Sequence, residues 1–199
     1  MRYTTPLIRP GQSIGLLGGS FDPPHAGHVH ISLEAMKRFG LDRLWWLVSP
    51  GNPLKVNGPA PMDKRLAASR EIMTHPRVDV TDIEAQMGTR YTAETLQKLR
   101  ARYPATRFVW LMGADNMVQF PKWERWDWIM ENVPVGVMAR PGQRLSARMS
   151  KAADRYGRWR VPAYESHKLP HCAPPAWCFI NIPMSNISST AIRASGGWG

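Results

Sequence analysis

Cysteines and long apolar runs are both scarce in this sequence. The two cysteines, Cys172 and Cys178, are too few for a disulfide scaffold and fit a reducing compartment. The longest apolar stretches fall well short of the about 20 residues that a helix needs to cross a bilayer, and the N-terminal residues lack the apolar core of a signal peptide. The sequence therefore predicts a cytoplasmic protein with no membrane segment.

Acidic residues are also few relative to basic ones. The 199 residues include 26 Lys and Arg against 15 Asp and Glu, which gives a formal net charge of +11. Such a basic balance favours anionic partners, either phosphorylated small molecules or nucleic acid. The length suits one domain spanning residues 1–199. Within it, we expect residues 1–12 to form an irregular N-terminal tail and residues 142–175 to form a less regular basic segment.

Short apolar runs alternate with amphipathic stretches along the chain. Strands are expected at residues 13–19, 42–50, 77–84, 107–115, 134–142 and 176–183. Helices are expected at residues 27–39, 62–75, 92–104 and 188–195, with Asp63 and Thr92 as N-caps of the second and third. This alternation predicts an α/β fold with a mostly parallel sheet covered by helices on both faces. In such folds ligands bind beyond the carboxyl ends of the strands.

The segment GGSFDPPHAGH, residues 18–28, directly follows the first predicted strand. His25 and His28 are three residues apart, so both lie on one face of the first turn if a helix begins near His25. A phosphate there would meet unpaired backbone N–H groups, the helix dipole and two imidazoles. Gly19 would let the backbone approach the ligand closely, and Gly27 would leave room between the rings.

Other interpretations of this segment fit less well. A dinucleotide-binding fingerprint needs G-x-G-x-x-G, whereas the glycines here are Gly15, Gly18 and Gly19. A P-loop needs a Gly-Lys-Ser/Thr ending, which the sequence lacks. Two histidines could bind a metal, but the further ligand nearby is Asp22 alone, so no metal site is predicted. The remaining alternative is that the histidines merely occupy a helix start.

Two signatures near opposite ends of the chain resemble those of the nucleotidyltransferase superfamily. GGSFDPPHAGH resembles G-x-F-D-P-x-H-x-G-H, and ISSTAIR, residues 187–193, resembles the motif I-S-S-T-x-I-R that holds ATP phosphates. Four further segments narrow the resemblance to the bacterial nicotinate mononucleotide adenylyltransferases. They are SPGNPLK (49–55), RYTAETL (90–96), GADNMVQFPKWERW (113–126) and ARPG (139–142).

The resemblance implies a Rossmann-like three-layer sandwich of the nucleotidyltransferase type. It also implies transfer of AMP from ATP to nicotinate mononucleotide, giving nicotinate adenine dinucleotide and pyrophosphate in NAD biosynthesis. Mg²⁺ would enter with ATP, and the mononucleotide phosphate would attack the α-phosphorus in line, without a covalent enzyme intermediate. Related transferases acting on nicotinamide mononucleotide or on phosphopantetheine are the nearest alternatives, and a homo-oligomer is compatible with the resemblance.

The resemblance assigns roles to two sets of residues. The catalytic residues would be His25 and His28, which would donate to the α- and β-phosphate oxygens as charge builds up there. The ATP-binding set would comprise Gly18, Gly19, Ser20, Phe21, His25, His28, Ile187, Ser188, Ser189, Thr190 and Arg193. The mononucleotide-binding set would comprise Lys55, Thr92, Asp115, Trp123 and Arg140.

The members of the second set would act in different ways. Thr92 and neighbouring backbone N–H groups would hold the nicotinate carboxylate, and Trp123 would stack on the pyridine ring. Asp115 would bind ribose hydroxyls or orient a catalytic group, while Lys55 and Arg140 would neutralise phosphate. A simpler role is also open to each: a helix cap for Thr92 and Asp115, a core aromatic for Trp123, and a solvated cation for the two basic residues.

Two other patterns suggest different functions. A basic stripe on a helix would suit a nucleic-acid-binding protein, but no aromatic platform or recognised motif accompanies it, which favours a solvated face. That stripe would comprise Arg144, Arg148, Lys151 and Arg155. A cluster of sulfur and imidazole ligands could suggest zinc, but its spacing matches no standard site. That cluster would comprise His167, His171, Cys172 and Cys178.

Overall fold

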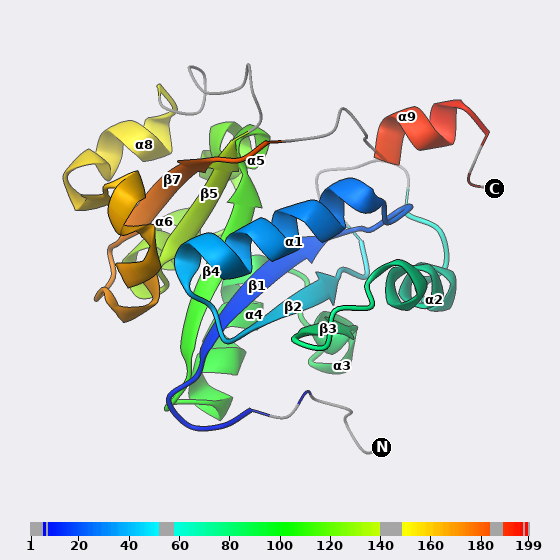
Figure 1. Ribbon diagram of the computed structural model, residues 1–199, viewed down its shortest axis with the longest axis horizontal. Coiled ribbons are helices and arrows are strands. Elements are labelled where there is room, and N and C mark those ends of the chain that lie inside the picture. The colour runs from blue at the N-terminus through cyan, green and yellow to red at the C-terminus, as the bar shows by residue number, and fades with distance from the viewer. Residues whose placement is uncertain are drawn as a thin grey trace.

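The computed structural model describes residues 6, 8–51, 58–139, 149–183, 189–196 and 198, and these residues form one sheet with helices on both of its faces (Figure 1). The strands lie in the order β3-β2-β1-β4-β5-β7-β6, and all neighbouring strands pair in parallel. Their bounds are β1 Ser13–Gly19, β2 Arg43–Val48, β3 Val78–Thr81, β4 Arg107–Gly113, β5 Val135–Ala139, β6 Arg160–Val161 and β7 Trp177–Asn181. The predicted α/β fold is confirmed.

The strands are buried on both faces because apolar side chains alternate between two core clusters. On β2, Trp45 and Leu47 belong to one cluster, and Trp46 and Val48 belong to the other. The first cluster is covered by α3 (Ile83–Gln86), α4 (Thr92–Arg102), α5 (Ala114–Gln119), α6 (Trp126–Asn132) and α8 (Lys151–Arg155). The second is covered by α1 (Ala26–Phe39), α2 (Met62–Ile72) and the 3-10 helix η3 (Ala163–His171). This arrangement is the expected three-layer sandwich.

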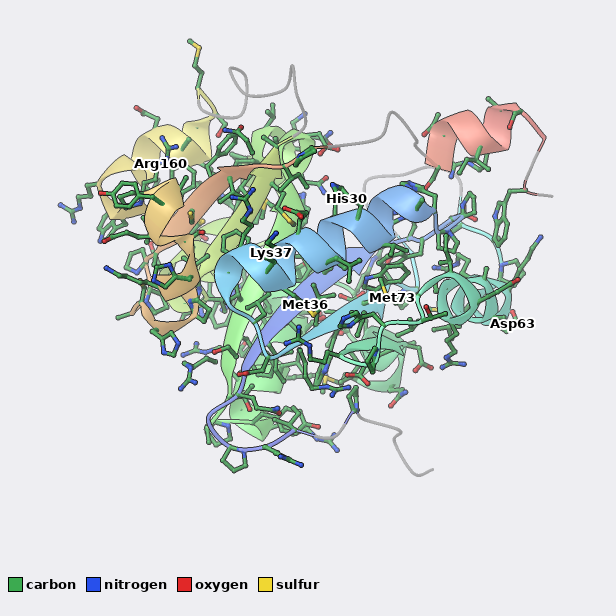
Figure 2. All side chains as sticks on the ribbon, in the orientation of Figure 1. His30, Met36, Lys37, Asp63, Met73 and Arg160 are labelled. Carbon is green, nitrogen blue, oxygen red and sulfur yellow. The ribbon has the colours of Figure 1, made fainter. Side chains whose placement is uncertain are left out.

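Two predicted helix caps are wrong. Asp63, labelled in Figure 2, is the second residue of α2, because the chain turns into the helix at Pro61. Thr92 is the first residue of α4, and extended Tyr91 occupies the cap position. Asp63 still lies in the first turn, where a carboxylate favours the helix dipole. The predicted strand 77–84 is also shorter, since it ends at Thr81 and α3 follows.

The less regular segment contains several short elements in its described part, residues 149–175. These are α8, the 3-10 helix η2 (Gly157–Trp159), the two-residue strand β6 and η3. The remaining elements are the 3-10 helix η1 (Phe120–Lys122) and α9 (Ser189–Ala194). No helix in the described part of the chain is long and apolar enough to span a bilayer.

Candidate active site

The start of α1 brings the two motif histidines into contact. His25 is the N-cap, and its Nδ1 accepts a hydrogen bond from the backbone N–H of Gly27 at 3.1 Å. The Nδ1 of His28 accepts from the backbone N–H of His25 at 3.2 Å, and the two ring centroids lie 3.9 Å apart. Because both Nδ1 atoms accept, the hydrogen of each neutral ring lies on Nε2. Both imidazoles can therefore act as Nε2–H donors from one helix start.

Aromatic packing supports these rings from the core side. Phe21, only 1% exposed, has a φ of 47°, and its ring stacks on Trp46 with centroids 4.6 Å apart. Its centroid is also 4.9 Å from that of His28. The indole N–H of Trp46 donates to the Ser32 hydroxyl, which in turn donates to the carbonyl of His28. The first turn of α1 is therefore anchored to β2 through side chains.

Aromatic rings pack closely against Gly18 and Gly19 of the motif. A Cβ at Gly18 would lie 2.5 Å from the indole ring of Trp110, which is too close for any residue with a side chain. A Cβ at Gly19 would lie 3.3 Å from the ring of Phe21. The next residue, Ser20, is half-buried, and its carbonyl accepts a hydrogen bond from Arg65. Packing and hydrogen bonding within the protein thus fix the shape of this loop independently of a ligand.

The second signature lies directly against the first. The Ser189 hydroxyl donates to the carbonyl of Pro23 at 2.8 Å, and Arg193 donates to the carbonyl of Asp22. Arg193 also lies 3.7 Å from the carboxylate of Asp22 and 3.4 Å from the hydroxyl of Thr190. Figure 1 shows α9 beside the amino end of α1. The two ATP-motif segments are thus in direct contact. Ile187 and Ser188 lie outside the described residues.

The start of α4 is the region predicted to bind the nicotinate carboxylate, and the hydrogen-bond donors there are backbone N–H groups. Thr92 is half-buried at the first helical position, and no side chain of the N-cap residue bonds to this turn. The first N–H groups of a helix have no intrahelical partners, so this start can receive a carboxylate. The Arg90 backbone N–H takes a separate partner, the Glu94 carboxylate, at 3.3 Å.

The remaining members of the mononucleotide set lie on other elements. Asp115 is exposed on α5, and its carboxylate oxygen lies 2.4 Å from where a Cβ at Gly113 would be, so a side chain at Gly113 would displace the Asp115 carboxylate. Trp123 is half-buried, with its ring 5.3 Å from Phe120 and nearly perpendicular to it. Trp123 thus packs against the core and is also partly accessible. Lys55 and Arg140 lie outside the described residues.

A buried carboxylic acid that was not among the predicted site residues contacts the first turn of α4. Glu84 accepts a hydrogen bond from the Thr95 hydroxyl at 3.4 Å, and that hydroxyl lies 2.8 Å from the hydroxyl of Thr89. Burial raises the pKa of Glu84 to about 7, and the Thr95 hydrogen bond opposes the shift. The signal in the sequence was a glutamate between apolar residues in a segment predicted as a strand.

A buried arginine was missed as well. Arg65 on α2 is 1% exposed and donates to three main-chain carbonyls. Burial lowers its pKa, and the charge of Asp22 opposes that shift. Arg65 and Ser69 share the buried face of α2 with Leu66. Polar residues at this spacing on an apolar helix face were the signal that could have identified it.

The zinc and nucleic-acid patterns gain no support from the geometry. Among the described residues, no group of three or more His, Cys, Asp or Glu side chains is arranged to hold a metal. Cys178 lies within β7, where burial raises its pKa to about 11 and so disfavours the thiolate that binds zinc. Of the basic stripe, Lys151 and Arg155 lie on α8, and Arg155 stacks over Trp126. Arg144 and Arg148 lie outside the described residues.

A parallel sheet with paired imidazoles at a helix start, and a second motif docked against the loop that leads to them, is the arrangement of a nucleotidyltransferase. A family model described as cytidylyltransferase-like matches residues 16–195. The chain is 63% identical to a probable nicotinate-nucleotide adenylyltransferase of Ruegeria pomeroyi, over 100% of this chain and 93% of that relative. It is 68% identical to one of Cereibacter sphaeroides, over 93% and 98% of the two chains. The chain therefore belongs to the nicotinate-nucleotide adenylyltransferase family, enzymes of NAD biosynthesis.

Solved structures agree on the fold. A nicotinic acid mononucleotide adenylyltransferase of Plasmodium falciparum, solved in complexes with APC and with NaAD, superposes with TM-scores of 0.68 and 0.70. Each superposition covers 92% of this chain and 83% of that chain, at 16% sequence identity. The nucleotidyltransferase fold expected from the sequence is thus confirmed.

Proposed function

We propose that the chain carries out the reaction of its family by direct transfer, without a covalent intermediate. An oxygen of the nicotinate mononucleotide phosphate forms a bond to the α-phosphorus of ATP. The bond from that phosphorus to the bridging oxygen of the β-phosphate breaks, and pyrophosphate leaves with the electron pair. The product is nicotinate adenine dinucleotide. Such a displacement needs alignment and charge stabilisation more than it needs protein nucleophiles.

The contact between His25 and His28 is the observation that carries this proposal. Their rings lie 3.9 Å apart, and both Nδ1 atoms are engaged with backbone N–H groups. The Nε2–H groups then donate to the α- and β-phosphate oxygens, where negative charge grows during transfer. Donors that are already oriented need no reorganisation at the moment of reaction. The start of α1 adds the positive end of its dipole.

The α9 segment supports binding of the outer phosphates. Ser189 and Thr190 begin α9 next to the Asp22–Pro23 backbone, and Arg193 provides the positive charge there. We propose that ATP enters as its magnesium complex, in which the phosphates and water supply most of the metal ligands. The ion is then part of the substrate.

The nicotinate ring is proposed to bind between α4 and Trp123. Backbone N–H groups at Thr92 and the following residues receive the carboxylate, and the exposed part of the Trp123 ring stacks on the pyridine. Asp115 takes ribose hydroxyls, while Lys55 and Arg140 neutralise the phosphate. A cytoplasmic location and a homo-oligomeric state stay predictions from the sequence and the resemblance.

The test is turnover by the purified protein with ATP, Mg²⁺ and one acceptor at a time. Nicotinate mononucleotide, nicotinamide mononucleotide and phosphopantetheine are compared by pyrophosphate release, and the dinucleotide is identified by its mass. We expect rapid release with the nicotinate form and a slower reaction with the amide. Release without any acceptor, or equal rates with the acid and the amide, contradicts the proposed specificity. Matched reactions with the His25→Ala/His28→Ala double variant exclude contaminating activity.

A further inference from the structure

The Arg65 guanidinium connects three separate backbone segments near the histidines. Its Nε donates to the carbonyl of Ala60 at 2.7 Å. One terminal nitrogen donates to the carbonyl of Ser20 at 2.7 Å and to that of Ser49 at 2.8 Å. All three acceptors are main-chain carbonyls, and the Arg65 side chain is almost fully buried. A buried charge with three short backbone bonds is held in one orientation.

The three carbonyls belong to loops at the carboxyl edge of the sheet. Ser20 lies in the motif loop after β1, Ser49 follows β2, and Ala60 precedes α2. The first two loops also meet through the backbone N–H of Ser49, which donates to the carbonyl of Gly19 at 2.9 Å. In Figure 1, α2 lies beyond the ends of β1 and β2, on the same side as α9 and the amino end of α1. Arg65 therefore lies where the loops of the active site converge.

The Ser20 carbonyl belongs to the peptide that leads into Phe21. Phe21 has a φ of 47°, which is unfavourable for a residue with a large side chain and needs support from its surroundings. Fixing this peptide from the Ser20 side holds the Phe21 ring against the rings of Trp46 and His28. A shift of the peptide would move the support of the catalytic imidazole.

We propose that Arg65 is a positioning residue for the transfer reaction, which fixes the motif loop relative to the loop after β2 so that the histidines meet the phosphates. The inference rests on the proposed function of those histidines. Lysine cannot replace it, because a single ammonium group on a flexible stem cannot serve three carbonyls in the directions that a planar fork reaches. A misplacement of about 1 Å caused by a residue away from the chemistry can cost about 100-fold in rate.

The experiment compares Arg65→Ala and Arg65→Lys with Arg43→Ala as the matched control. Arg43 is on β2 and bonds the Asp79 carboxylate and the carbonyl of Pro76. Thermal unfolding, kcat and the KM for each substrate are measured for all three variants. We expect Arg65→Ala to lower kcat/KM for ATP about 100-fold, and Arg65→Lys to recover only a small part of that loss. Arg43→Ala should lower thermal stability and leave the kinetic constants unchanged.

Chemical rescue separates positioning from general destabilisation. Guanidinium ion, below the concentration that unfolds the protein, should restore part of the activity of Arg65→Ala and none in Arg43→Ala. The inference is overturned if Arg65→Lys has wild-type kcat/KM, or if folded Arg65→Ala shows no guanidinium-dependent recovery. If Arg65→Ala does not fold, a large loss in folded Arg65→Lys supports the inference.

A binding measurement keeps this inference apart from the proposed function. ATP is titrated into wild type and Arg65→Lys without acceptor, with tryptophan fluorescence as the readout. Weaker ATP binding by Arg65→Lys supports a positioning role even if wild type fails to adenylylate nicotinate mononucleotide. Failure of wild-type turnover alone contradicts the proposed function, whereas unchanged ATP binding together with unchanged turnover contradicts the role of Arg65.

Discussion

The starts of α1 and α4 present different kinds of hydrogen-bond donor. At α1, the imidazoles of His25 and His28 accept from backbone N–H groups of the first turn. At α4, no side chain of the N-cap residue Tyr91 bonds to the first turn. The α1 start therefore presents ring N–H donors, and the α4 start presents the backbone N–H groups themselves. In the proposed reaction, the charge that grows during transfer would meet the imidazole donors of α1, and the nicotinate carboxylate would meet the backbone N–H groups of α4.

The side chains that contact the two helix starts from the core also differ. The α1 start lies against a stacked Phe21–Trp46 pair. In the first turn of α4, Thr95 joins Thr89 and Glu84 in a buried cluster through its hydroxyl group. The Phe21 and Trp46 rings do not titrate, whereas the Glu84 carboxyl group titrates with a pKa of about 7. We therefore expect the two sites to respond differently to substitution and to pH.

The largest effect is expected from His28→Ala. Loss of one oriented donor costs about 3 kcal/mol, so kcat should fall about 100-fold. The variant also loses the acceptor for the His25 backbone N–H, which should lower stability by about 1 kcal/mol. Pyrophosphate release and thermal unfolding measure the two effects.

His30→Ala is the matched control for this substitution. His30 lies on the second turn of α1, and its ring contacts the carbonyl of Pro183 (Figure 2). It should keep the wild-type kcat. Equal losses in both variants would show that the α1 start is sensitive to any change, and the distinction between catalytic and structural histidines would not hold.

Sequence patterns were sufficient for the parts of this comparison that depend on local chemistry. Short apolar runs between amphipathic stretches predicted β1, β2 and β4. The spacing of His25 and His28 predicted that both lie at one helix start. The burial of Arg65 had a signal in the sequence, but the contacts by which Phe21 and Arg65 support the site had none, because they join residues far apart in the chain. The Thr92 cap was wrong by one residue, since a cap depends on where the extended chain ends and not only on residue type.

The second prediction separates backbone from hydroxyl at the α4 start. Thr92→Pro removes a backbone N–H at the first helical position, where proline is well tolerated, and extended Tyr91 suits a following proline. A hydrogen bond to a charged group is worth about 1.5–3 kcal/mol, so the KM for nicotinate mononucleotide should rise about 10- to 100-fold. Thr92→Val removes only the hydroxyl and should have a smaller effect. If both variants have the same KM, the backbone N–H does not hold the carboxylate.

A smaller effect is expected at Trp123. Aromatic stacking contributes about 0.5–1.5 kcal/mol, so Trp123→Ala should raise the KM for the mononucleotide by up to about 10-fold with little change in the KM for ATP. Trp123→Phe should retain most of the binding. Trp128→Ala is the control, because Trp128 lies on α6 with its ring near Arg125. A rise in both Michaelis constants would place Trp123 in the general packing of the site.

Glu84→Gln should change turnover least and the pH dependence of stability most. Below pH 4.5 the carboxyl group is protonated in both the folded and the unfolded chain. Between pH 4.5 and about 7 the unfolded chain ionises while the folded chain holds the proton, so wild-type stability falls as the pH rises. The full loss is about 3 kcal/mol, and it is complete above pH 7. Glutamine keeps an acceptor for the Thr95 hydroxyl and cannot ionise.

Urea unfolding of wild type and Glu84→Gln between pH 4.5 and 8 tests this sign. The free energies of unfolding should diverge as the pH rises, with the variant the more stable protein at pH 8. Exposed Glu124→Gln should follow the wild-type curve. Parallel curves for wild type and Glu84→Gln would mean that the α4 start has no titrating support, and the contrast with α1 would then lie only in the donors that each helix presents.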